Sequence, residues 1–380
     1  MKKGVFLTVA VTLAAVSSLC GSDSVAKIDK NFRAVTIGKK QKVNFFNAFA
    51  KPCEVTGFPW WDGKNGPYRI PAGFTLKEVN RGVLTLAHHS SGGAVRFVTD
   101  SPFIALRAVY KRFSDMNHMP RSGSGGFDLY SVDEKGNEVY VSTINPGRVN
   151  DKKPLVQLFK YRMPKQKAPR LYTIYLPLYS GVKELEIGIE PGAKMLPPPQ
   201  QKISKPILFY GSSITQGGCA SRPANNYTTM LCRAVDAPQI NLGFSGSAKG
   251  ETAMAEAISK LDLSLFVMDY DYNAPNAAHL LKTHEKFFQI IRKAQPELPI
   301  IILSRCSLMQ DARRDAVKRT YDNAVKAGDK KVWFVDGSEL FGEAGQNYCT
   351  VDRCHPNDLG FYLMFRRLLP VVKAALNTGR

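Results

Sequence analysis

The sequence lacks the residue patterns that mark metal, redox and membrane-spanning proteins. It has seven cysteines, but no two have the C-x-x-C spacing of a zinc site or a redox dithiol. No cluster of histidines and carboxylates has the spacing of metal ligands. The apolar run from Val5 to Val16 is too short to span a bilayer as a mature helix. We therefore expect no metal, no cofactor and no transmembrane segment in the mature protein.

Acidic residues are also scarce. The chain has 32 aspartates and glutamates against 52 lysines and arginines, which gives a formal net charge of +20 at pH 7. No basic run is interleaved with aromatic residues, so we do not expect a nucleic-acid partner. The surplus charge favours an anionic glycan or an anionic surface as a partner, although a well-solvated surface would also explain it.

The first 22 residues (1–22) have the features of a secretory signal peptide, with Lys2 and Lys3 ahead of a short apolar run and small residues. We therefore expect an exported protein, in the periplasm, outside the cell or on its surface. Cys20 offers the alternative of a lipid-anchored N-terminus, but Leu19 fits a lipoprotein cleavage box poorly. In an oxidising compartment some of the other six cysteines can pair, and the sequence does not say which.

A chain of 380 residues is too long for one ordinary core and favours two domains. Residues 25–193 contain short runs rich in β-branched and aromatic residues, separated by Gly, Asp, Ser and Pro turns. These runs are Val83–Leu86, Ala94–Val98, Phe103–Tyr110, Phe127–Tyr130, Glu138–Ser142, Leu171–Leu176 and Leu185–Ile189. The pattern predicts an all-β sandwich or jelly roll.

Residues 194–204 form a linker with three consecutive prolines, which favour an extended and fairly stiff connection. Residues 205–380 then alternate between strand and helix patterns. The strands are Ile207–Tyr210, Gln239–Leu242, Leu263–Met268, Ile300–Leu303 and Val332–Val335, and the helices are Tyr227–Val235, Ala253–Ser259, Ala278–Ala294, Ala312–Lys326 and Leu359–Leu376. Such alternation predicts an α/β domain with a parallel sheet and helices on both faces.

Ser213 follows the first of these strands in the sequence Gly-Ser-Ser-Ile. A tight turn from strand to helix lifts a serine hydroxyl clear of a parallel sheet, so Ser213 is the candidate nucleophile. An ordinary Ser/Gly turn explains these residues equally well. Gly246 and Asn273 follow two further strands, and ligands of parallel sheets bind at the carboxyl ends of the strands.

Together with Asp352-x-x-His355, these blocks resemble the SGNH (GDSL-type) hydrolase family between Pro206 and about Leu376. The run Gly126–Tyr130 is similar to the G-x-D-L-Y signature of the jelly-roll domain that precedes some SGNH-type esterases. The resemblance implies an N-terminal jelly roll followed by a flavodoxin-like SGNH domain. It also implies hydrolysis of carboxylic esters through an acyl-serine intermediate.

The resemblance further implies a role for each site residue. Ser213 would be the nucleophile, His355 the general base, and Asp352 the group that orients the imidazole. The developing oxyanion would be bound by the backbone N–H groups of Ser213 and Gly246 and by the side-chain amide of Asn273.

Two positions depart from the family pattern. Ser212 stands where aspartate is usual, and Ala274 follows Asn273 where aspartate is usual. Asp269 or Asp271 could supply the second acidic group, although a structural hydrogen-bonding role is an equally good interpretation. The departures argue against close kinship with the best-known lipases and thioesterases and favour the branch that carries the jelly roll.

Three side chains are candidates for substrate binding, namely His118 and Arg121 on a polar loop before the G-x-D-L-Y strand, and Asp271. Surface or packing roles are expected for His88, His89, His279 and His284. The favoured substrate is an O-acyl group on carbohydrate, O-acetyl above all, because export and an appended β domain suit a polymeric glycan. Other small esters, a lipid or thioester acylhydrolase, and a glycan-binding protein with a silent hydrolase domain remain as alternatives.

Overall fold

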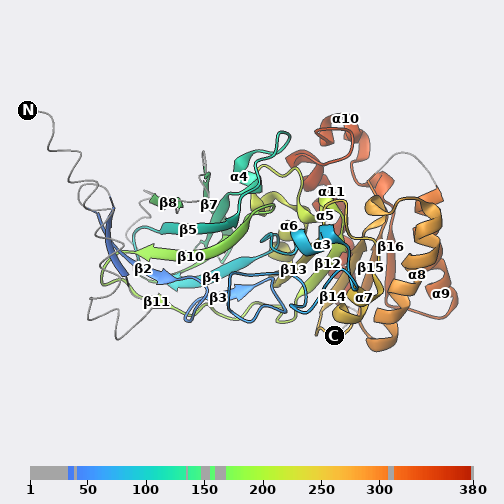
Figure 1. The fold of residues 1–380 in the computed structure, drawn as a ribbon, viewed down its shortest axis with the longest axis horizontal. Coiled ribbons are helices and arrows are strands. Elements are labelled where there is room, and N and C mark those ends of the chain that lie inside the picture. Colours follow the sequence, from blue (N-terminus) through green and yellow to red (C-terminus); the bar gives the residue numbers. More distant parts are fainter. Residues whose placement is uncertain are drawn as a thin grey trace, which may run out of the picture.

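The computed structural model describes residues 33–37, 41–133, 136–146, 155–158, 168–306 and 312–377. The expected signal peptide and Cys20 lie outside these residues. The described chain forms an elongated molecule with a β-rich N-terminal region at one end and an α/β region at the other (Figure 1). None of its described helices is long and apolar enough to cross a membrane.

The N-terminal region contains two antiparallel sheets. The first has the strand order β1 (Arg33–Ile37), β2 (Gln41–Asn47), β10 (Gly181–Ile189), β5 (Ala105–Arg112) and β8 (Leu155–Leu158). The second has the order β11 (Met195–Leu196), β4 (Ala94–Thr99), β9 (Arg170–Tyr175), β6 (Phe127–Val132) and β7 (Glu138–Ile144), and β3 (Glu54–Thr56) pairs with β4. The expected all-β region is confirmed.

Alternation along the strands separates the two faces of the second sheet. Val95 and Phe97 of β4 lie in the sandwich core with Tyr172 of β9. The intervening side chains, among them Arg96 and Thr173, point the other way and line a cavity that α/β residues also line. The outer face of this sheet is therefore turned toward the α/β region.

All five strands of the α/β region are parallel. Their order is β13 (Gln239–Gly243), β12 (Ile207–Gly211), β14 (Leu265–Asp269), β15 (Ile300–Leu303) and β16 (Val332–Val335). One face is covered by α6 (Tyr227–Val235) and α11 (Asp358–Asn377), and the other by α7 (Thr252–Ile258), α8 (Ala277–Ala294) and α9 (Ala312–Lys326). The expected parallel sheet between two helical layers is confirmed.

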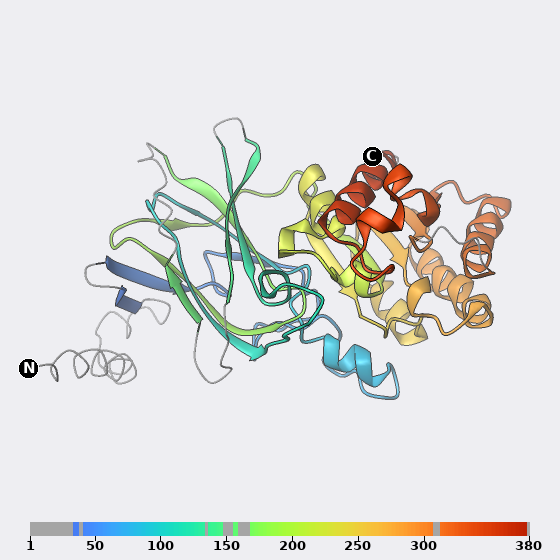
Figure 2. The same ribbon diagram turned by 90° about the horizontal axis from the view of Figure 1, so that it is seen from above.

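The predicted strand at Val83–Leu86 is wrong, because these residues belong to a helix, α3 (Arg81–Leu86). The Asn80 side chain caps this helix by accepting hydrogen bonds from the N–H groups of Gly82 at 3.0 Å and Val83 at 3.2 Å. Val83 is fully buried in the core of the α/β region, and Figure 2 shows α3, in light blue, along the flank of that region. The cap and this long-range packing outweigh the local β propensity.

The G-x-D-L-Y strand β6 joins the two regions. Asp128 Oδ2 accepts hydrogen bonds from Arg222 Nη1 at 3.0 Å and from the Ala224 N–H at 2.7 Å. The Tyr130 hydroxyl accepts a further bond from Arg222 Nη1 at 2.8 Å. Burial raises the pKa of Asp128 above its ordinary value, although Arg222 favours the charged form. Because the carboxylate is fully buried, loss of either charge would be costly.

The proline-rich linker contacts both regions. Its first residues form β11, which pairs with β4, and Arg96 Nη2 donates to the Pro199 carbonyl at 3.0 Å. Further along, the Lys202 N–H donates to Asp236 Oδ2 at 3.0 Å. The two regions are therefore connected by a packed segment of chain.

Candidate active site

The strand β12 ends in a tight turn that presents Ser213. A Cβ on Gly211 would lie only 2.4 Å from a neighbouring backbone oxygen, so glycine is required there. Ser212 then caps the short helix α5 (Ser213–Gln216), with its Oγ accepting a hydrogen bond from the Ile214 N–H at 3.2 Å. Ser212 is fully buried and its hydroxyl is used by the cap, whereas the Ser213 hydroxyl is turned toward the loop before α11.

Asp352 and His355 lie on that loop. His355 Nε2 is 2.8 Å from Ser213 Oγ, and His355 Nδ1 is 2.7 Å from Asp352 Oδ2. The Cys219 N–H, which follows the turn that carries Ser213, donates to the Pro356 carbonyl at 2.9 Å and holds the loop in place. The three residues that the sequence suggested as a triad are thus joined by hydrogen bonds.

Asp352 is held in its charged form. Burial opposes ionisation, but hydrogen bonds from the backbone and ring of His355 and from the Cys354 N–H outweigh it, so the pKa of Asp352 lies below its ordinary value. A carboxylate beside Nδ1 keeps a proton on that nitrogen. The same hydrogen-bond network then leaves Nε2 of His355 able to accept a proton.

Three donors lie at the carboxyl ends of β13, β12 and β14, which are paired in parallel. Within the described residues, the backbone N–H groups of Ser213 and Gly246 donate to no protein acceptor. Asn273 Nδ2 donates one hydrogen bond, to the Phe244 carbonyl at 2.9 Å. Gly246 has a φ of +64° and open space beside its α-carbon. This edge of the sheet, where the Ser213 turn also lies, therefore carries donors that bind no protein acceptor in the described structure.

A loop of the N-terminal region reaches the triad. The ring centroid of His118 lies 5.8 Å from that of His355, and His118 Nδ1 is 3.0 Å from Asn117 Oδ1. Both His118 and Asn117 are exposed. Arg121 forms an ion pair with Asp115, which closes the base of the loop. His118 is thus placed beside the triad, and Arg121 supports the loop that carries it.

Asp271 lies beneath the surface. It is fully buried, and its Oδ2 accepts a hydrogen bond from the Arg305 N–H at 3.0 Å. Burial raises the pKa of Asp271 to about 6. Because a substrate cannot reach a fully buried side chain, the expectation that Asp271 contacts substrate is corrected. Asp269 is also internal, and its Oδ2 accepts hydrogen bonds from the Thr215 and Tyr227 hydroxyls, both at 2.8 Å.

Sequence reasoning missed the side chains that hold the turn that carries Ser213. Gln216, the last residue of α5, accepts a hydrogen bond from the Ser245 N–H at 3.0 Å and contacts His89 Nδ1 at 3.1 Å. The Tyr179 hydroxyl donates to the Ser213 carbonyl at 3.2 Å. His89 and Tyr179 belong to the N-terminal region. No local signal could have found the Gln216–His89 contact, because it spans 127 residues.

The described part of the chain contains no group of three His, Cys, Asp or Glu residues arranged to hold a metal ion. Its six cysteines are free, and five of them are buried. Cys354, between the two triad residues of the loop, is partly exposed, and burial raises the pKa of its thiol.

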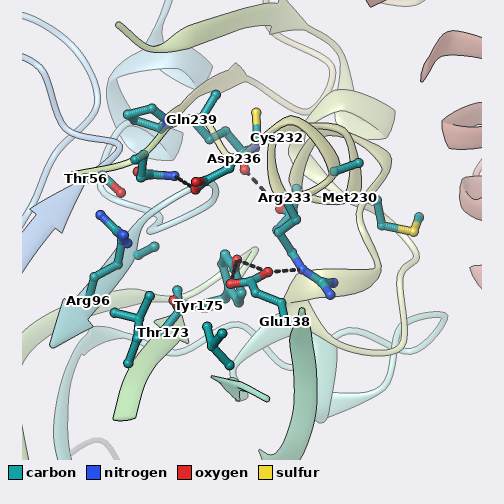
Figure 3. A pocket seen from close by; sticks show the side chains of 18 of the residues that line it. Thr56, Arg96, Glu138, Thr173, Tyr175, Met230, Cys232, Arg233, Asp236 and Gln239 are labelled. Carbon is teal, nitrogen blue, oxygen red and sulfur yellow. Dashed lines mark hydrogen bonds and ion pairs between the residues drawn. The ribbon is translucent and has the colours of Figure 1, made fainter. Parts of the chain in front are cut away.

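A cavity of about 640 Å³ lies between the two regions (Figure 3). Arg96, Thr173 and Tyr175 line it from the second β-sheet, and Arg233 and Asp236 line it from the α/β region. None of the triad residues lines this cavity. Two of the triad side chains are open to solvent, since the side chain of His355 is 22% exposed and that of Asp352 is 39% exposed.

A serine, a histidine and a carboxylate joined by hydrogen bonds in this order, beside the carboxyl edge of a parallel sheet, have the arrangement of a serine-hydrolase triad. Residues 204–373 match the GDSL-like lipase/acylhydrolase family, and residues 43–195 match the family described as the N-terminus of Esterase SGNH hydro-type. The chain therefore belongs to the SGNH (GDSL-type) hydrolases that carry a G-x-D-L-Y N-terminal domain, and it is an esterase or acylhydrolase.

Solved structures share the fold along most of the chain. A protein described as a GDSL-like lipase from Bacteroides ovatus is 25% identical, with a TM-score of 0.77, over 88% of this chain and 98% of its own. The salicylyl-acyltransferase SsfX3 is 20% identical, with a TM-score of 0.70, over 91% and 98%. A family two carbohydrate esterase from Clostridium thermocellum is 16% identical, with a TM-score of 0.59, over 86% and 99%. No curated protein matches the chain.

Proposed function

We propose that this protein is an exported serine esterase that removes O-acyl groups, O-acetyl above all, from carbohydrate. In this proposal Ser213 is the nucleophile, His355 the general base and Asp352 the residue that orients it. The observation that carries the proposal is the unbroken line of hydrogen bonds from Ser213 Oγ through His355 to Asp352, at 2.8 and 2.7 Å.

The proposed reaction has two steps. His355 Nε2 takes the proton of Ser213 Oγ while Oγ bonds to the acyl carbon, and the carbonyl oxygen becomes negative. The bond to the sugar oxygen then breaks, and His355 returns the proton to the leaving alcohol. In the second step a water molecule gives a proton to His355 and attacks the acyl carbon. The bond to Ser213 Oγ then breaks, Oγ takes the proton back, and the carboxylic acid is released. Asp352 stabilises the imidazolium that forms in both steps.

The proposed oxyanion hole consists of the Ser213 N–H, the Gly246 N–H and the Asn273 amide. Two observations support it. Both backbone donors lack an acceptor in the described structure, and the Asn273 side-chain amide, which has two N–H donors, donates only one hydrogen bond there. Fixed donors that face the developing negative charge need no reorganisation during the reaction, and each is typically worth ~100- to 1000-fold in rate.

The choice of carbohydrate rests on the polar and open surroundings of the triad. Exposed His118 and Asn117 can exchange hydrogen bonds with sugar hydroxyls. Tyr348 is 70% exposed on α10 (Gly345–Cys349), four residues before Asp352, and offers a ring against which a pyranose can pack. Solved carbohydrate esterases share the fold, among them an acetyl xylan esterase from Butyrivibrio proteoclasticus at 13% identity.

The finer proposals of export and of an anionic glycan as partner rest on the N-terminal sequence and on the net charge of +20. If the glycan is anionic, added salt should slow its deacetylation, because counter-ions screen the attraction. Hydrolysis of a neutral small ester should not respond in this way, and serves as the control.

The test compares p-nitrophenyl acetate, butyrate and octanoate with acetylated xylan, and measures p-nitrophenol and acetate release. Ser213→Ala serves as the blank. We expect acetate to be preferred over octanoate and acetyl groups to be released from the polymer. Activity confined to octanoate would establish the lipid alternative, and no release from any ester would establish the binding-protein alternative.

A further inference from the structure

The oxyanion loop, which we define as Phe244–Ser247, is held from outside its own region. It follows β13, an edge strand of the parallel sheet. Arg69, from the N-terminal region, is fully buried beside this edge. Its Nη1 donates to the carbonyls of Asn241 and Gly243 at 2.8 and 2.9 Å, and its guanidinium lies 4.7 Å from the centroid of the Phe244 ring.

Arg69 thus takes the place of a neighbouring strand. The carbonyls of residues two apart point to the same side of a strand, and on an edge strand that side has no partner strand. Arg69 satisfies two such carbonyls at once, the second of them directly before the oxyanion loop. Its Nη2 also donates to the Leu86 carbonyl at 2.7 Å, which fixes the guanidinium to α3.

The middle of the loop is held through Gln216. Its Oε1 accepts from the Ser245 N–H, while its Nε2 donates to the Leu178 carbonyl at 3.1 Å and lies 3.1 Å from His89 Nδ1. The Ser91 hydroxyl donates to the Gln216 carbonyl at 2.6 Å. Burial, and after it Arg69, lowers the pKa of His89 to about 3, so the ring is neutral, and its Nδ1 accepts from the Gln216 amide in the tautomer that is protonated on Nε2.

The end of the loop is held by the residue that caps α3. Asn80 Nδ2 donates to the Ser247 carbonyl at 2.7 Å. The N-terminal region therefore fixes positions 243, 245 and 247 in turn, directly or through Gln216. Gly246 between them donates to no protein acceptor in the described structure.

We propose that Arg69, His89 and Asn80 are positioning residues for catalysis, which set the oxyanion loop so that the Gly246 N–H and the Asn273 amide face the reacting carbonyl. The inference rests on the proposed assignment of the oxyanion donors. It means that the N-terminal region contributes to the chemical step itself, even on an ester too small to touch that region.

The physical reason is the steep dependence of catalysis on geometry. A shift of about 1 Å at a reacting group costs on the order of 100-fold in rate. The Phe244 carbonyl also binds the Asn273 amide, so a displaced loop would move two of the three proposed donors together. Loss of such donors weakens binding of the transition state and leaves ground-state binding of a small ester nearly unchanged.

The experiment measures kcat and KM for p-nitrophenyl acetate in the full chain carrying Arg69→Met. We expect kcat to fall by roughly 10- to 100-fold with KM little changed. Arg69→Lys, which keeps the charge and one donor direction, should recover part of the loss. The matched control is Arg233→Met, because Arg233 also crosses between the regions, to Glu138 at 2.7 Å, but lies on the cavity of Figure 3.

A double-mutant cycle separates positioning from general damage. In a chain that already carries Asn273→Ala, Arg69→Met should cost much less than it does in the wild type, because both changes act on the same donors. A folded Arg69→Met protein with wild-type kcat would overturn the proposal, and so would losses that simply multiply in the double variant. Should Arg69→Met not fold, His89→Phe is judged by the same two criteria.

The result also separates this inference from the proposed function. If Ser213→Ala abolishes turnover while Arg69→Met keeps full kcat, the site assignment stands and only the positioning role fails. If Ser213→Ala keeps turnover, the site assignment itself fails.

Discussion

The two sides of the proposed triad are held by different parts of the chain. Ser213 lies on a buried turn whose carbonyl is bound by Tyr179 of the N-terminal region at 3.2 Å. Asp352 and His355 lie on a more exposed loop that is closed by its own backbone, with the Val351 N–H donating to the His355 carbonyl at 2.9 Å. The Ser213 side is thus bonded to both regions. The backbone bond that closes the His355 loop lies within the α/β region, and the N-terminal region only places His118 beside it.

The N-terminal region is not an independent domain, because it also supplies part of the α/β core. Ile70, Val79, Val83 and Ala87 pack into the core of the α/β region, so an isolated α/β fragment would expose that surface. A deletion of the N-terminal region would therefore change the core of the part it was meant to test. Single substitutions on the two sides of the site compare them without this difficulty.

The largest loss of kcat is expected when the Ser213 hydroxyl or the His355 imidazole is removed. Ser213→Ala and His355→Ala should each lower kcat by roughly 10⁴-fold or more, because members of a triad act as a unit. Steady-state kinetics on p-nitrophenyl acetate, with circular dichroism as the check of folding, measures this. Near-normal turnover in a folded Ser213→Ala protein would contradict the assignment.

An Asp→Asn substitution should mainly lower kcat in the loop that carries His355, and mainly lower stability at the interface between the two regions. Asp352→Asn should lower kcat by about 10⁴-fold, because the imidazole loses its correct tautomer. Its effect on stability should be small, since the loop is partly exposed. Asp128→Asn should instead lower the free energy of unfolding by ~2–3 kcal/mol, because it leaves Arg222 without its charged partner.

Urea unfolding and kinetics on the same two proteins measure both quantities. Equal loss of stability in the two variants would remove the distinction between the loop that carries His355 and the interface.

Asn273→Ala should have the next largest effect, a loss of ~100- to 1000-fold in kcat. The Asn273 amide donates to the Phe244 carbonyl, so the variant also removes a contact of the oxyanion loop. Asn276→Ala, in the cap of α8, is the control for loss of a nearby amide. A kcat for Asn273→Ala equal to that of this control would exclude the amide from the oxyanion hole.

The buried carboxyl group of Asp269 should make the stability of the protein depend on pH. Burial, and then Asp271, raises the pKa of Asp269 to about 8 from its ordinary 3.8. The folded protein therefore binds a proton at Asp269 that the unfolded chain releases between these values. Stability falls as pH rises through this window and levels off above about pH 8. Asp269→Asn should show a smaller decline, and unfolding curves at pH 5 and pH 8 that change equally in both proteins would contradict this.

The smallest effects are expected at the mouth of the site. His118→Ala and Tyr348→Ala should raise KM for an acetylated oligosaccharide a few-fold, roughly the effect of one lost polar or ring contact. Their kinetics on p-nitrophenyl acetate should stay close to wild type. An unchanged KM for the oligosaccharide in both variants would remove these residues from the substrate site.

The α/β region was readily predicted from the sequence, and the N-terminal region less so. Buried parallel strands such as Ile207–Gly211 are continuous apolar runs, which a single sequence reveals. The sequence does not predict the strands β1, β2, β3, β8 and β11, because short edge or partly polar strands lack such a run. Val83–Leu86 has the composition of a strand, and its place in a distant core is not visible locally, although Asn80 just before the helix is a local N-cap signal.

The site divides in the same way. Ser213 stands in a short motif at a strand end, and Asp352 and His355 stand in a short motif on the loop before α11, so motifs alone suggest these residues as candidates. Arg69 and His89 lie in no motif, and their contacts with the α/β region span more than 100 residues. Side chains that act through tertiary contacts leave no periodic or local signal in one sequence.

The central claim, that Ser213 is the nucleophile, is tested most directly by covalent labelling. The protein is treated with diethyl p-nitrophenyl phosphate, which phosphorylates activated serines, and the labelled peptide is identified by mass spectrometry. We predict one adduct, on Ser213, with labelling slowed strongly in His355→Ala and absent in Ser213→Ala. An adduct on Ser212 or elsewhere, with Ser213 unmodified in an inactivated enzyme, would contradict the account.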